Sequence, residues 1–595
     1  MPGNDPSDPD MQRLYSLVER LVAGDDILVH EAPRERTAPG LPLIAGPQIE
    51  VIEGTAREDL ARRCSDLARR SAVALSSLHR DGLDGIAVGT ADRTMFVDLR
   101  RNDGVPPALR DLLAGSTRKI VHGLAHDARR LLSAGVTVTN VVDLYAAAVL
   151  SDGYARERSA QEYGLDALVA RHLQGNLVAG RRIAARCGSE VRALVLLEPR
   201  LKAAVERAGV GQVWQLENDA VVPIAAVELA GFTIDVPQVQ RRLDDCEHQR
   251  SEARGQLSAI LGEFDIDNAD DLRAVLGHAC GFAFAFTTGP HLRALAQRFP
   301  FLSEVVRYRE ASVHKHHLEC WLKSADTNDR VHPTFDSMGA ATGRMTCFAP
   351  PLHSTPRVLR SCFVASPGAR LIIADYHAIE LAIIANFTRD PELMNCFRRG
   401  IDPHRRTASH LAGVQMARVP DSLRGRAKPI NYGFAFGMGV HTFREYAAEM
   451  YGHVFDEPTA TRVRRRFFEL YRRVAAWHEH VRTQGSKSLA VRSPCGRLRR
   501  FEKFELPAYL STPIQSLAAS GFKRALVLMN DRLQPTEAKI IHLQHDEFVV
   551  EAPEKCVLQV ARIVEEVMTE AMHQFVQAVP IKVKVTIAKS WDGTE

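Results

Sequence analysis

A polar turn between two largely apolar runs is the feature that most constrains how this chain can fold. The segment 540–553 places His545, Asp546 and Glu547 between those runs. Two strand-like runs joined by a short polar turn predict a β-hairpin with acids at its tip. Another carboxylate, Asp375, closes the apolar run 371–374 just before a helical pattern begins. The sequence therefore predicts carboxylates held rigidly at the ends of two strands.

A helical pattern between these segments carries cations and aromatics on one face. Arg424, Lys428, Tyr432 and, less strictly, Phe436 follow one another at four-residue spacing, so they share a helix face. Such a face suits a phosphate tail at its cationic end and a base or sugar at its aromatic end. Taken singly, each segment is compatible with ordinary turn or core chemistry. Together they predict phosphoryl transfer with two Mg²⁺ ions, because Mg²⁺ needs few protein carboxylates when substrate phosphates complete its shell.

Composition excludes several other classes of protein. The 595 residues are 45% hydrophobic and 25% charged, which is ordinary for a globular chain of several domains. No apolar run approaches the roughly 20 residues of a membrane helix, and the N-terminus lacks a secretory pattern. The ten cysteines are scattered singly, as is typical of reduced thiols. We therefore expect a soluble cytoplasmic protein with no membrane partner.

The net charge of +4 indicates no partner, but the placement of charge does. Residues 461–503 hold thirteen Lys or Arg against three Glu, with aromatics interleaved. A solvated helix face is one interpretation of such a run, and a surface for a phosphate backbone is the other. The basic stretch includes Arg499 and Arg500, which we expect to contact DNA.

Three regions follow one another along the chain. Residues 1–45 are rich in Pro, Asp and Gly around one amphipathic stretch, which predicts a flexible extension with a short helix. Residues 46–205 alternate strand-like runs at 71–75, 85–89 and 95–99 with helical patterns, which predicts an α/β unit. Residues 206–595 are mainly helical at first, with helices expected at 217–230 and 300–323, and mixed later.

The three chemistry-bearing segments resemble motifs A, B and C of the family A (polymerase I-type) DNA polymerases, in the family's order, over residues 215–595. Supporting matches are Thr342-Gly-Arg344, Asp402-Pro-His404, Pro513-Ile-Gln515 and the C-terminal run 583–591. The resemblance implies an α/β plus α+β multidomain chain: an RNase H-like, exonuclease-type domain followed by a right-hand polymerase of palm, fingers and thumb. The thumb would span about 235–330 and the palm and fingers about 331–595, with the fingers around 400–480.

The resemblance also implies roles for individual residues. Asp375, Asp546 and Lys428 would be catalytic, and the Tyr376 carbonyl would join the two aspartates as a metal ligand with Glu547 close by. The dNTP would meet Arg424, Lys428, Tyr432, His404, Glu380 and Phe436. The DNA would meet Arg344, Lys315, Gln515 and His545. Glu380 would exclude ribonucleotides, and Tyr432 would make the enzyme tolerant of dideoxynucleotides.

This sequence departs from the family pattern at several positions. In motif A, His377, Ala378 and Ala382 replace Ser, Gln and Arg. Pro429 lies inside the motif B helix, where a proline removes a hydrogen bond and can kink the helix. Phe436 stands where many members have Tyr, so Glu380 would lack a hydroxyl partner. These changes bear on fidelity and sugar discrimination more than on the chemical step, since both aspartates remain.

Residues 46–205 resemble the 3′–5′ exonuclease domain of the family without its first acids. Ser76 and Leu78 stand where the first motif has Asp-x-Glu, whereas Asp127 and Asp143 match later motifs. Ala184 and Gly188, or nearby Glu190, stand at the third motif. A two-metal nuclease without its first carboxylates loses its ions, so we expect no proofreading.

The expected function is therefore DNA-templated DNA synthesis by a monomer acting on primer–template DNA and dNTPs, with other replication proteins as further partners. One alternative is a single-subunit RNA polymerase, against which Glu380 argues. Another is a non-catalytic DNA-binding or replisome scaffold, against which the retention of Asp375, Lys428 and Asp546 argues. The sequence leaves open a role in replication, repair or lesion bypass, and a phage, plasmid or chromosomal origin.

Overall fold

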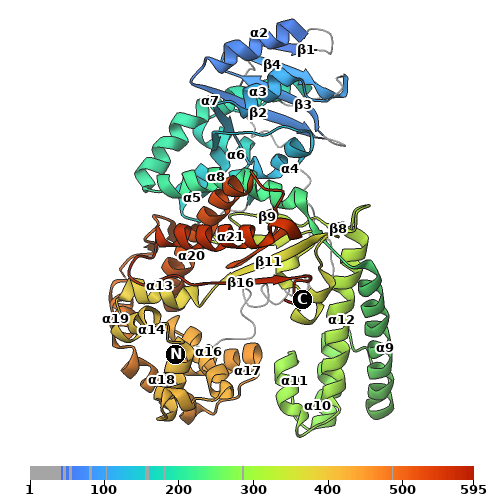
Figure 1. The fold of residues 1–595 in the computed structure, drawn as a ribbon, viewed down its shortest axis with the longest axis vertical. Coiled ribbons are helices and arrows are strands. Elements are labelled where there is room, and N and C mark those ends of the chain that lie inside the picture. The colour runs from blue at the N-terminus through green and yellow to red at the C-terminus, as the bar shows by residue number, and fades with distance from the viewer. Residues whose placement is uncertain are drawn as a thin grey trace.

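A six-stranded mixed sheet organises the N-terminal region, at the top of Figure 1. Its order is β1-β4-β3-β2-β5-β6, with β2, β3 and β4 antiparallel and β1, β5 and β6 in parallel pairings. The strands are β1 (Gln48–Ile52), β2 (Ala72–His79), β3 (Leu83–Gly89), β4 (Arg93–Asp98), β5 (Arg118–Val121) and β6 (Val141–Asp143). The predicted strands at 71–75, 85–89 and 95–99 are thus confirmed.

The computed structural model describes residues 42–44, 48–52, 57–79, 83–101, 104–154, 160–178, 183–284, 287–485 and 487–594. The helix expected in residues 1–45 lies outside the described residues. No helix in the described part of the chain is long and apolar enough to span a bilayer.

Helices cover both faces of the N-terminal sheet, which explains the apolar runs on both sides of its central strands. Val73 and Leu75 face one layer, whereas Ala74 faces the other, because successive strand residues point to opposite sides. One layer holds α2 (Arg57–Ala68), α3 (Pro107–Ala114) and α4 (Ala125–Ser133), and the other holds α5 (Leu144–Asp152), α6 (Leu165–Leu173) and α7 (Ile183–Ala208). The region is the α/β unit that the sequence predicts.

The helix α8 (Gly211–Ala230) joins this region to the rest of the chain and ends at Gly231, whose φ is 63°. Ala220, Ile224 and Val227 belong to the large C-terminal core, whereas Val221 and Ala225 belong to the N-terminal one. The helix predicted at 217–230 is confirmed, and it begins earlier than the sequence pattern indicated.

A four-stranded antiparallel sheet lies at the centre of the C-terminal part, in the order β14-β15-β11-β16. Its strands are β11 (Ala369–Tyr376), β14 (Lys539–Gln544), β15 (Glu547–Pro553) and β16 (Val583–Ala588). The hairpin predicted at 540–553 is β14–β15, and Asp375 is opposite Glu547 in the register. The helices α20 (Leu506–Leu533) and α21 (Val557–His573) pack against each other and complete this layer, which we call the palm.

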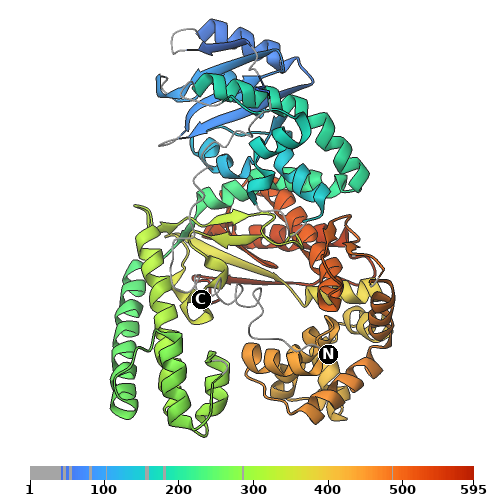
Figure 2. The ribbon, with the colours of Figure 1, turned by 180° about the vertical axis from the view of Figure 1, so that it is seen from behind.

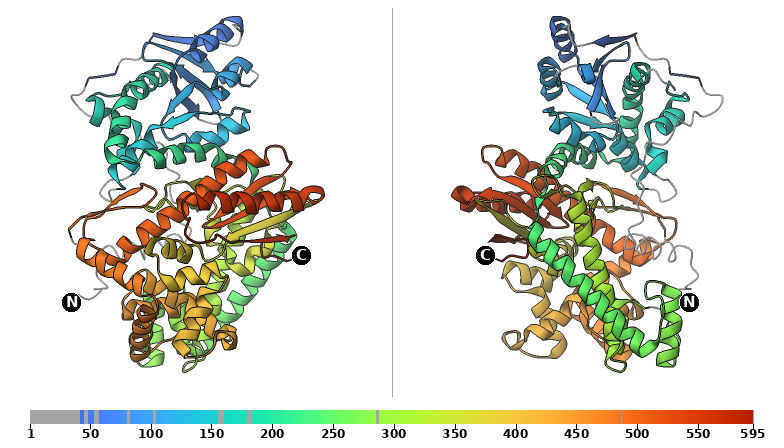
Figure 3. Two further views of the ribbon diagram at one scale, coloured as in Figure 1. Left: turned by 60° about the vertical axis from the view of Figure 1, so that its left-hand side comes forward. Right: turned by 90° about the vertical axis from the view of Figure 1, so that its right-hand side faces the viewer.

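Two helical groups extend from opposite sides of the palm (Figures 1 and 2). The thumb contains α9 (Val236–Leu261), α10 (Ala269–Cys280), α11 (Gly289–Ala296) and α12 (Leu302–Ser324). The fingers contain α13 (Ile379–Thr388), α14 (Pro391–Arg398), α15 (Pro403–Ala412), α16 (Asp421–Ala435), α17 (Val440–Tyr451), α18 (Glu457–Leu470) and α19 (Arg472–Gly485). The views in Figure 3 keep the N-terminal region at one end of the molecule and the thumb and fingers at the other.

Short elements complete the fold. The remaining strands are β7 (Phe232–Thr233), β8 (Arg330–Val331), β9 (Thr334–Asp336), β10 (Thr346–Phe348), β12 (Ala490–Arg492) and β13 (Leu498–Arg500). The 3₁₀ helices are η1 (Leu99–Arg101), η2 (Ala160–Tyr163), η3 (Leu352–Ser354), η4 (Arg357–Cys362), η5 (Met416–Arg418) and η6 (Glu554–Cys556).

The helix α16 continues through Pro429. A proline cannot donate to the carbonyl four residues earlier, which here belongs to Gly425. The Gly425 carbonyl therefore lacks its usual helical donor, and the ring of His453 lies near the Gly425 backbone. The helix nevertheless remains continuous, so the cation–aromatic face stays helical.

The basic stretch 461–503 does not form one surface, so the interpretation of the whole stretch as DNA-facing is wrong. Its first part lies in α18 and α19 of the fingers, and its last part forms the hairpin β12–β13 against the N-terminal region. Arg492 donates to the Ala208 carbonyl, and Arg497 is fully buried. The charge run was misleading because its partners lie far away in the sequence.

Candidate active site

The two predicted aspartates lie next to each other at the edge of the palm sheet. Asp375 is near the end of β11, and Asp546 lies in the turn between β14 and β15. The Tyr376 backbone amide donates to the Asp546 carbonyl oxygen at 3.2 Å, which ties the two segments together. His545 adopts a φ of 54° in the turn. The apolar strands thus fix both carboxylates in the way that the sequence predicts.

Burial and mutual repulsion concentrate negative charge at this point. The pKa of Asp375 is raised to about 7, first by burial and then by the charges of Asp546 and Glu547. The pKa of Asp546 is raised to about 6, first by burial and then by the charge of Glu380. A bound cation would relieve this repulsion, because it favours the ionised form of each carboxylate.

Glu547 is less available than the two aspartates. The Trp591 indole donates to Glu547 Oε1 at 2.9 Å, and Arg360 Nη1 lies 3.5 Å from the same oxygen. Within the described ranges, no group of three or more His, Cys, Asp or Glu side chains is placed to hold a metal ion. The carboxylates that the described residues bring together at this edge, apart from the engaged Glu547, are those of Asp375 and Asp546. Hard oxygen donors of this kind suit Mg²⁺ when substrate phosphates supply further ligands.

The cation–aromatic face of α16 adjoins this edge. Arg424 Nη2 lies 2.6 Å from Asp402 Oδ2, and Asp402 also caps α15. Lys428 is half-buried, and it makes no hydrogen bond or ion pair with any described residue. His404 is 4% exposed, and its Nδ1 contacts Asn431 Nδ2 at 2.9 Å. Burial lowers the pKa of His404 to about 4, so His404 is a neutral group at pH 7, and Arg424 and Lys428 supply the positive charge.

The residues expected to face the sugar lie on α13 and at the end of α16. Tyr432 stacks at a tilt near His404, with ring centroids 5.6 Å apart. Burial first and the Glu380 carboxylate second raise the pKa of the Tyr432 phenol. Phe436 follows at the end of the helix and has no hydroxyl to offer. Glu380 instead pairs with Arg344, at 2.5 Å from Nη2 to Oε1. Sequence reasoning missed this ion pair, although the missing hydroxyl at position 436 indicated that Glu380 needed another partner.

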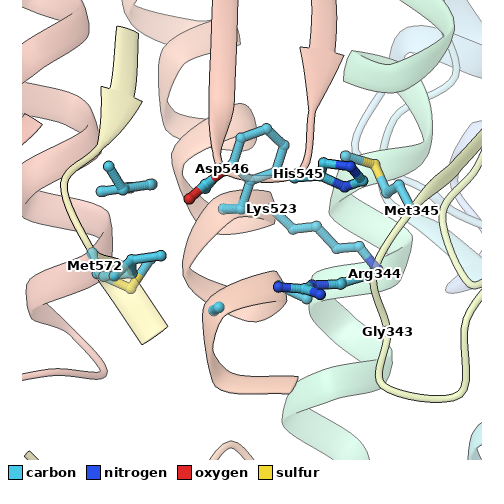
Figure 4. A pocket seen from close by; sticks show the side chains of 12 residues that line it. Gly343, Arg344, Met345, Lys523, His545, Asp546 and Met572 are labelled. Atoms are coloured by element: carbon cyan, nitrogen blue, oxygen red, sulfur yellow. The ribbon is translucent and has the colours of Figure 1, made fainter. Parts of the chain in front are cut away.

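A small pocket brings Arg344, His545 and Asp546 together (Figure 4). Lys523 also lines it and reaches from α20 toward the loop of Gly343 and Arg344. Sequence reasoning missed Lys523, whose signal was a lysine within the largely buried helix α20.

The other predicted DNA contacts are dispersed. Lys315 lies on thumb helix α12, where its Nζ is 2.6 Å from Glu247 and 3.1 Å from Glu319. Gln515 lies half-buried on α20. Arg499 donates to Thr512 Oγ1 at 3.0 Å and stacks over Phe501. The backbone amide of Arg500 donates to Gly153 of the N-terminal region. The Arg500 backbone thus lies at the junction with the N-terminal region, whereas Arg499 contacts residues of the C-terminal part, and neither arginine lines the pocket.

In the N-terminal sheet, the acids that matched later nuclease motifs are engaged within the protein. Ser76 Oγ donates to Glu190 Oε2 at 2.5 Å, and Ser77 Oγ donates to Asp127. Asp143 caps α5 and also accepts the backbone amides of Gly123 and Leu124. Leu78 is half-buried on β2.

The guanidinium of Arg186 pairs with two of the carboxylates in this part of the N-terminal region. Arg186 Nε lies 2.7 Å from Glu190, and its two terminal nitrogens donate hydrogen bonds to the Asp166 carboxylate at 2.8 and 3.2 Å. The Arg186 side chain thus places a fixed positive charge between two of the remaining carboxylates.

A palm sheet with paired aspartates, flanked by a helical thumb and by fingers that carry a cation–aromatic helix, defines a DNA-directed DNA polymerase. The model of DNA polymerase family A matches residues 237–593. The chain belongs to that family. This membership decides against the RNA polymerase alternative.

Similarity to known proteins extends beyond the matched region. The chain is 26% identical over 541 residues to DNA polymerase I of Aquifex aeolicus, covering 85% of this chain and 93% of that protein. It is 28% identical over 407 residues to the thermostable DNA polymerase I of Thermus aquaticus, covering 63% of this chain and 48% of that protein. The chain thus spans about half the length of the Thermus relative.

Among the solved structures with a similar fold is the POL domain of Pol1 from M. smegmatis in complex with DNA primer–template and dNTP. The TM-score is 0.81 at 24% identity, over 92% of this chain and 100% of that one.

Proposed function

We propose that this chain extends the 3′-hydroxyl of a primer on a DNA template, using dNTPs and two Mg²⁺ ions. The carrying observation is the pairing of Asp375 and Asp546, two partly buried carboxylates whose pKa values are both raised by their surroundings. Family membership and the primer–template and dNTP named for the M. smegmatis complex support these substrates.

Each residue of the site has a defined task in this proposal. Asp375, Asp546 and the Tyr376 carbonyl would hold the metals, which would supply positive charge to offset that of the phosphates and of the primer oxygen. Arg424 and Lys428 bind the triphosphate, and Tyr432 packs against the base and sugar. Arg344, His545 and Gln515 lie along the primer end, whereas Lys315 meets the duplex from the thumb once it exchanges its glutamates for phosphate. Positioning and charge neutralisation then account for most of the rate enhancement.

Primer extension on a defined template tests this proposal. We expect Asp546→Asn to lower single-nucleotide incorporation by at least about a thousandfold, because a neutral amide holds the metal poorly. Asp531→Asn, at an exposed position on α20, is the matched control and keeps wild-type activity. A wild-type chain that binds primer–template but does not extend it would favour the scaffold alternative.

We also propose that residues 46–205 form an exonuclease-like domain without proofreading activity. Ser76 and Leu78 replace the first acids, and Arg186 already neutralises Glu190 and Asp166. A labelled single strand incubated with Mg²⁺ tests this, and we expect no trimming from the 3′ end. Trimming that Asp127→Ala abolishes would overturn the proposal.

The remaining assignments are consistent with these two proposals. Residues 1–45 precede the domain 46–205, and residues 206–595 form the polymerase with its thumb at about 235–330. The protein acts as a cytoplasmic monomer in DNA replication or repair, alongside other replication proteins.

A further inference from the structure

The hairpin β12–β13 connects the fingers to the palm but is anchored in the N-terminal region. Arg492 Nη2 donates to the Ala208 carbonyl at 2.7 Å, and the Arg500 amide donates to the Gly153 carbonyl at 2.8 Å. Cys495 and Leu498 share one hydrophobic cluster with α5 and α7. The segment that enters α20 is therefore held by the domain that lacks the nuclease acids.

Three buried charges lie beneath this hairpin. The side chains of Glu217, Arg497 and Lys523 are each no more than 1% exposed. Glu217 Oε1 accepts hydrogen bonds from Arg497 Nη2 and, at 2.6 Å, from Lys523 Nζ. Lys523 also donates to the Ser337 carbonyl at 2.6 Å. Because breaking one partner of a buried ion pair leaves an uncompensated charge, the position of Arg497 is firmly determined.

The loop that carries Arg344 rests on the Arg497 guanidinium. Gly343 has a φ of 83°, and a Cβ added there would lie only 2.4 Å from Arg497 Cζ. Only glycine allows both this backbone conformation and so close an approach of the backbone to the Arg497 guanidinium. Arg344 follows directly, lines the polymerase pocket and pairs with Glu380. Contact with the guanidinium thus fixes the position of the Gly343 and Arg344 backbone relative to the palm.

Tyr154 holds Arg497 from the N-terminal side. Its hydroxyl accepts a hydrogen bond from Arg497 Nη1 at 2.8 Å. Tyr154 has a φ of 53°, and it follows Gly153, whose φ is 70°. A bulky residue in the left-handed region is rare and persists only where its surroundings require it. The backbone strain therefore serves to aim this hydroxyl at the guanidinium.

We propose that the N-terminal domain positions the primer side of the polymerase site through the contact series Tyr154–Arg497–Gly343, which presents Arg344 to the primer end. This inference rests on the proposed polymerase function. Tyr154 and Arg497 are positioning residues, since neither reaches the reacting atoms and both act through Arg344. The domain would thus serve synthesis directly, without any nuclease chemistry of its own.

A double-mutant cycle on the full chain tests the proposal. The maximum rate of single-nucleotide incorporation is measured per active site, at saturating DNA and dNTP, for wild type, Tyr154→Phe, Arg344→Ala and the double variant. We expect Tyr154→Phe to slow the wild type about fivefold but to change the Arg344→Ala background by less than about twofold, because residues in one contact series are not additive. Tyr145→Phe removes a hydroxyl from the same domain and leaves the rate unchanged. Equal slowing in both backgrounds, or no slowing, would overturn the proposal.

Hydrogen exchange without DNA gives a readout that does not depend on activity. The Gly343 amide donates to the Ala340 carbonyl at 2.8 Å, so its exchange reports opening of the loop. We expect Tyr154→Phe to speed exchange in a peptide covering residues 340–346, whereas Tyr145→Phe does not. Unchanged exchange contradicts the positioning role, whereas failure of the wild type to extend primers contradicts the proposed function.

Discussion

Arg344 and Glu380 form an ion pair at the polymerase pocket, with Nη2 of the arginine 2.5 Å from Oε1 of the glutamate. Both side chains are shielded from solvent, the glutamate more than the arginine. Phe436 offers no hydroxyl, so the guanidinium is what fixes the carboxylate beside Tyr432. The residue expected at the primer end thereby also positions the residue expected to face the sugar.

Removing the Glu380 carboxylate is expected to relax sugar discrimination. Glu380→Ala opens space beside the sugar, so we expect incorporation of rNTP relative to dNTP to rise about ten- to a hundredfold, as steric discrimination by one side chain allows. The measurement is the ratio of kcat/KM values for the two nucleotides. Glu392→Ala, which removes a carboxylate paired with Arg406 on the fingers, serves as the control. An unchanged ratio in Glu380→Ala would contradict the assignment.

The Tyr432 hydroxyl is expected to make the enzyme tolerant of chain terminators. The phenol can replace the interaction that a missing 3′-hydroxyl would have made, so the wild type should use ddNTP and dNTP with similar efficiency. We expect Tyr432→Phe to raise discrimination against ddNTP by more than about tenfold, measured as the ratio of kcat/KM values. Strong discrimination in the wild type, about 4 kcal/mol or more, would count against this role.

The need for Mg²⁺ is expected to depend on pH. The pKa of Asp375 is about 7 and that of Asp546 about 6, raised first by burial. Below these values protons occupy the carboxylates and compete with the metal, and above them the metal meets two free charges. We expect the Mg²⁺ concentration for half-maximal incorporation to be about tenfold higher at pH 6 than at pH 8. The same Mg²⁺ requirement at both pH values would show that the pKa values of the two carboxylates lie outside this pH range.

Glu228 is expected to reduce stability at alkaline pH. It lies on α8, 3% exposed, and accepts the Phe335 amide at 2.6 Å. Burial raises its pKa from 4.5 to about 7. Between these two pKa values the folded state keeps a proton on Glu228 that the unfolded state has lost. The stability that this protonation provides is fully present below about pH 4.5 and is lost as pH rises through 7.

Glu228→Gln keeps the acceptor oxygen without the charge. We expect it to stabilise the chain by about 1–3 kcal/mol at pH 8 and to have little effect at pH 5, measured by thermal or urea unfolding. Glu566→Gln, at an exposed position on α21, should change neither value. A stabilisation that is the same at both pH values would indicate a packing effect.

The sequence predicts the palm well, because its information is local there. Strand-like runs around a polar turn placed Asp546, and an apolar run placed Asp375 at a strand end. The four-residue spacing that defined the face of α16 holds through Pro429. Each of these features depends on residues close together in the chain.

Arg497 shows why other features could not be predicted. Within a run of basic residues it resembled a solvated or DNA-facing arginine, yet its carboxylate partner lies 280 positions away. Arg186 is similar, because its contact with Asp166 exists only once α7 has packed near α6. Charge patterning records the sign of a side chain, whereas burial and pairing depend on the finished fold.

The helix α8 has a consequence for the integrity of the whole molecule. Val221 and Ala225 complete the core of the N-terminal region, and Ala220, Ile224 and Val227 complete the core of the polymerase. Neither core can be dismantled without exposing apolar surface on a helix that the other still requires. The two regions should therefore unfold together as one cooperative unit. A chain truncated before α8 would expose the apolar face of α8 that normally packs against the N-terminal region.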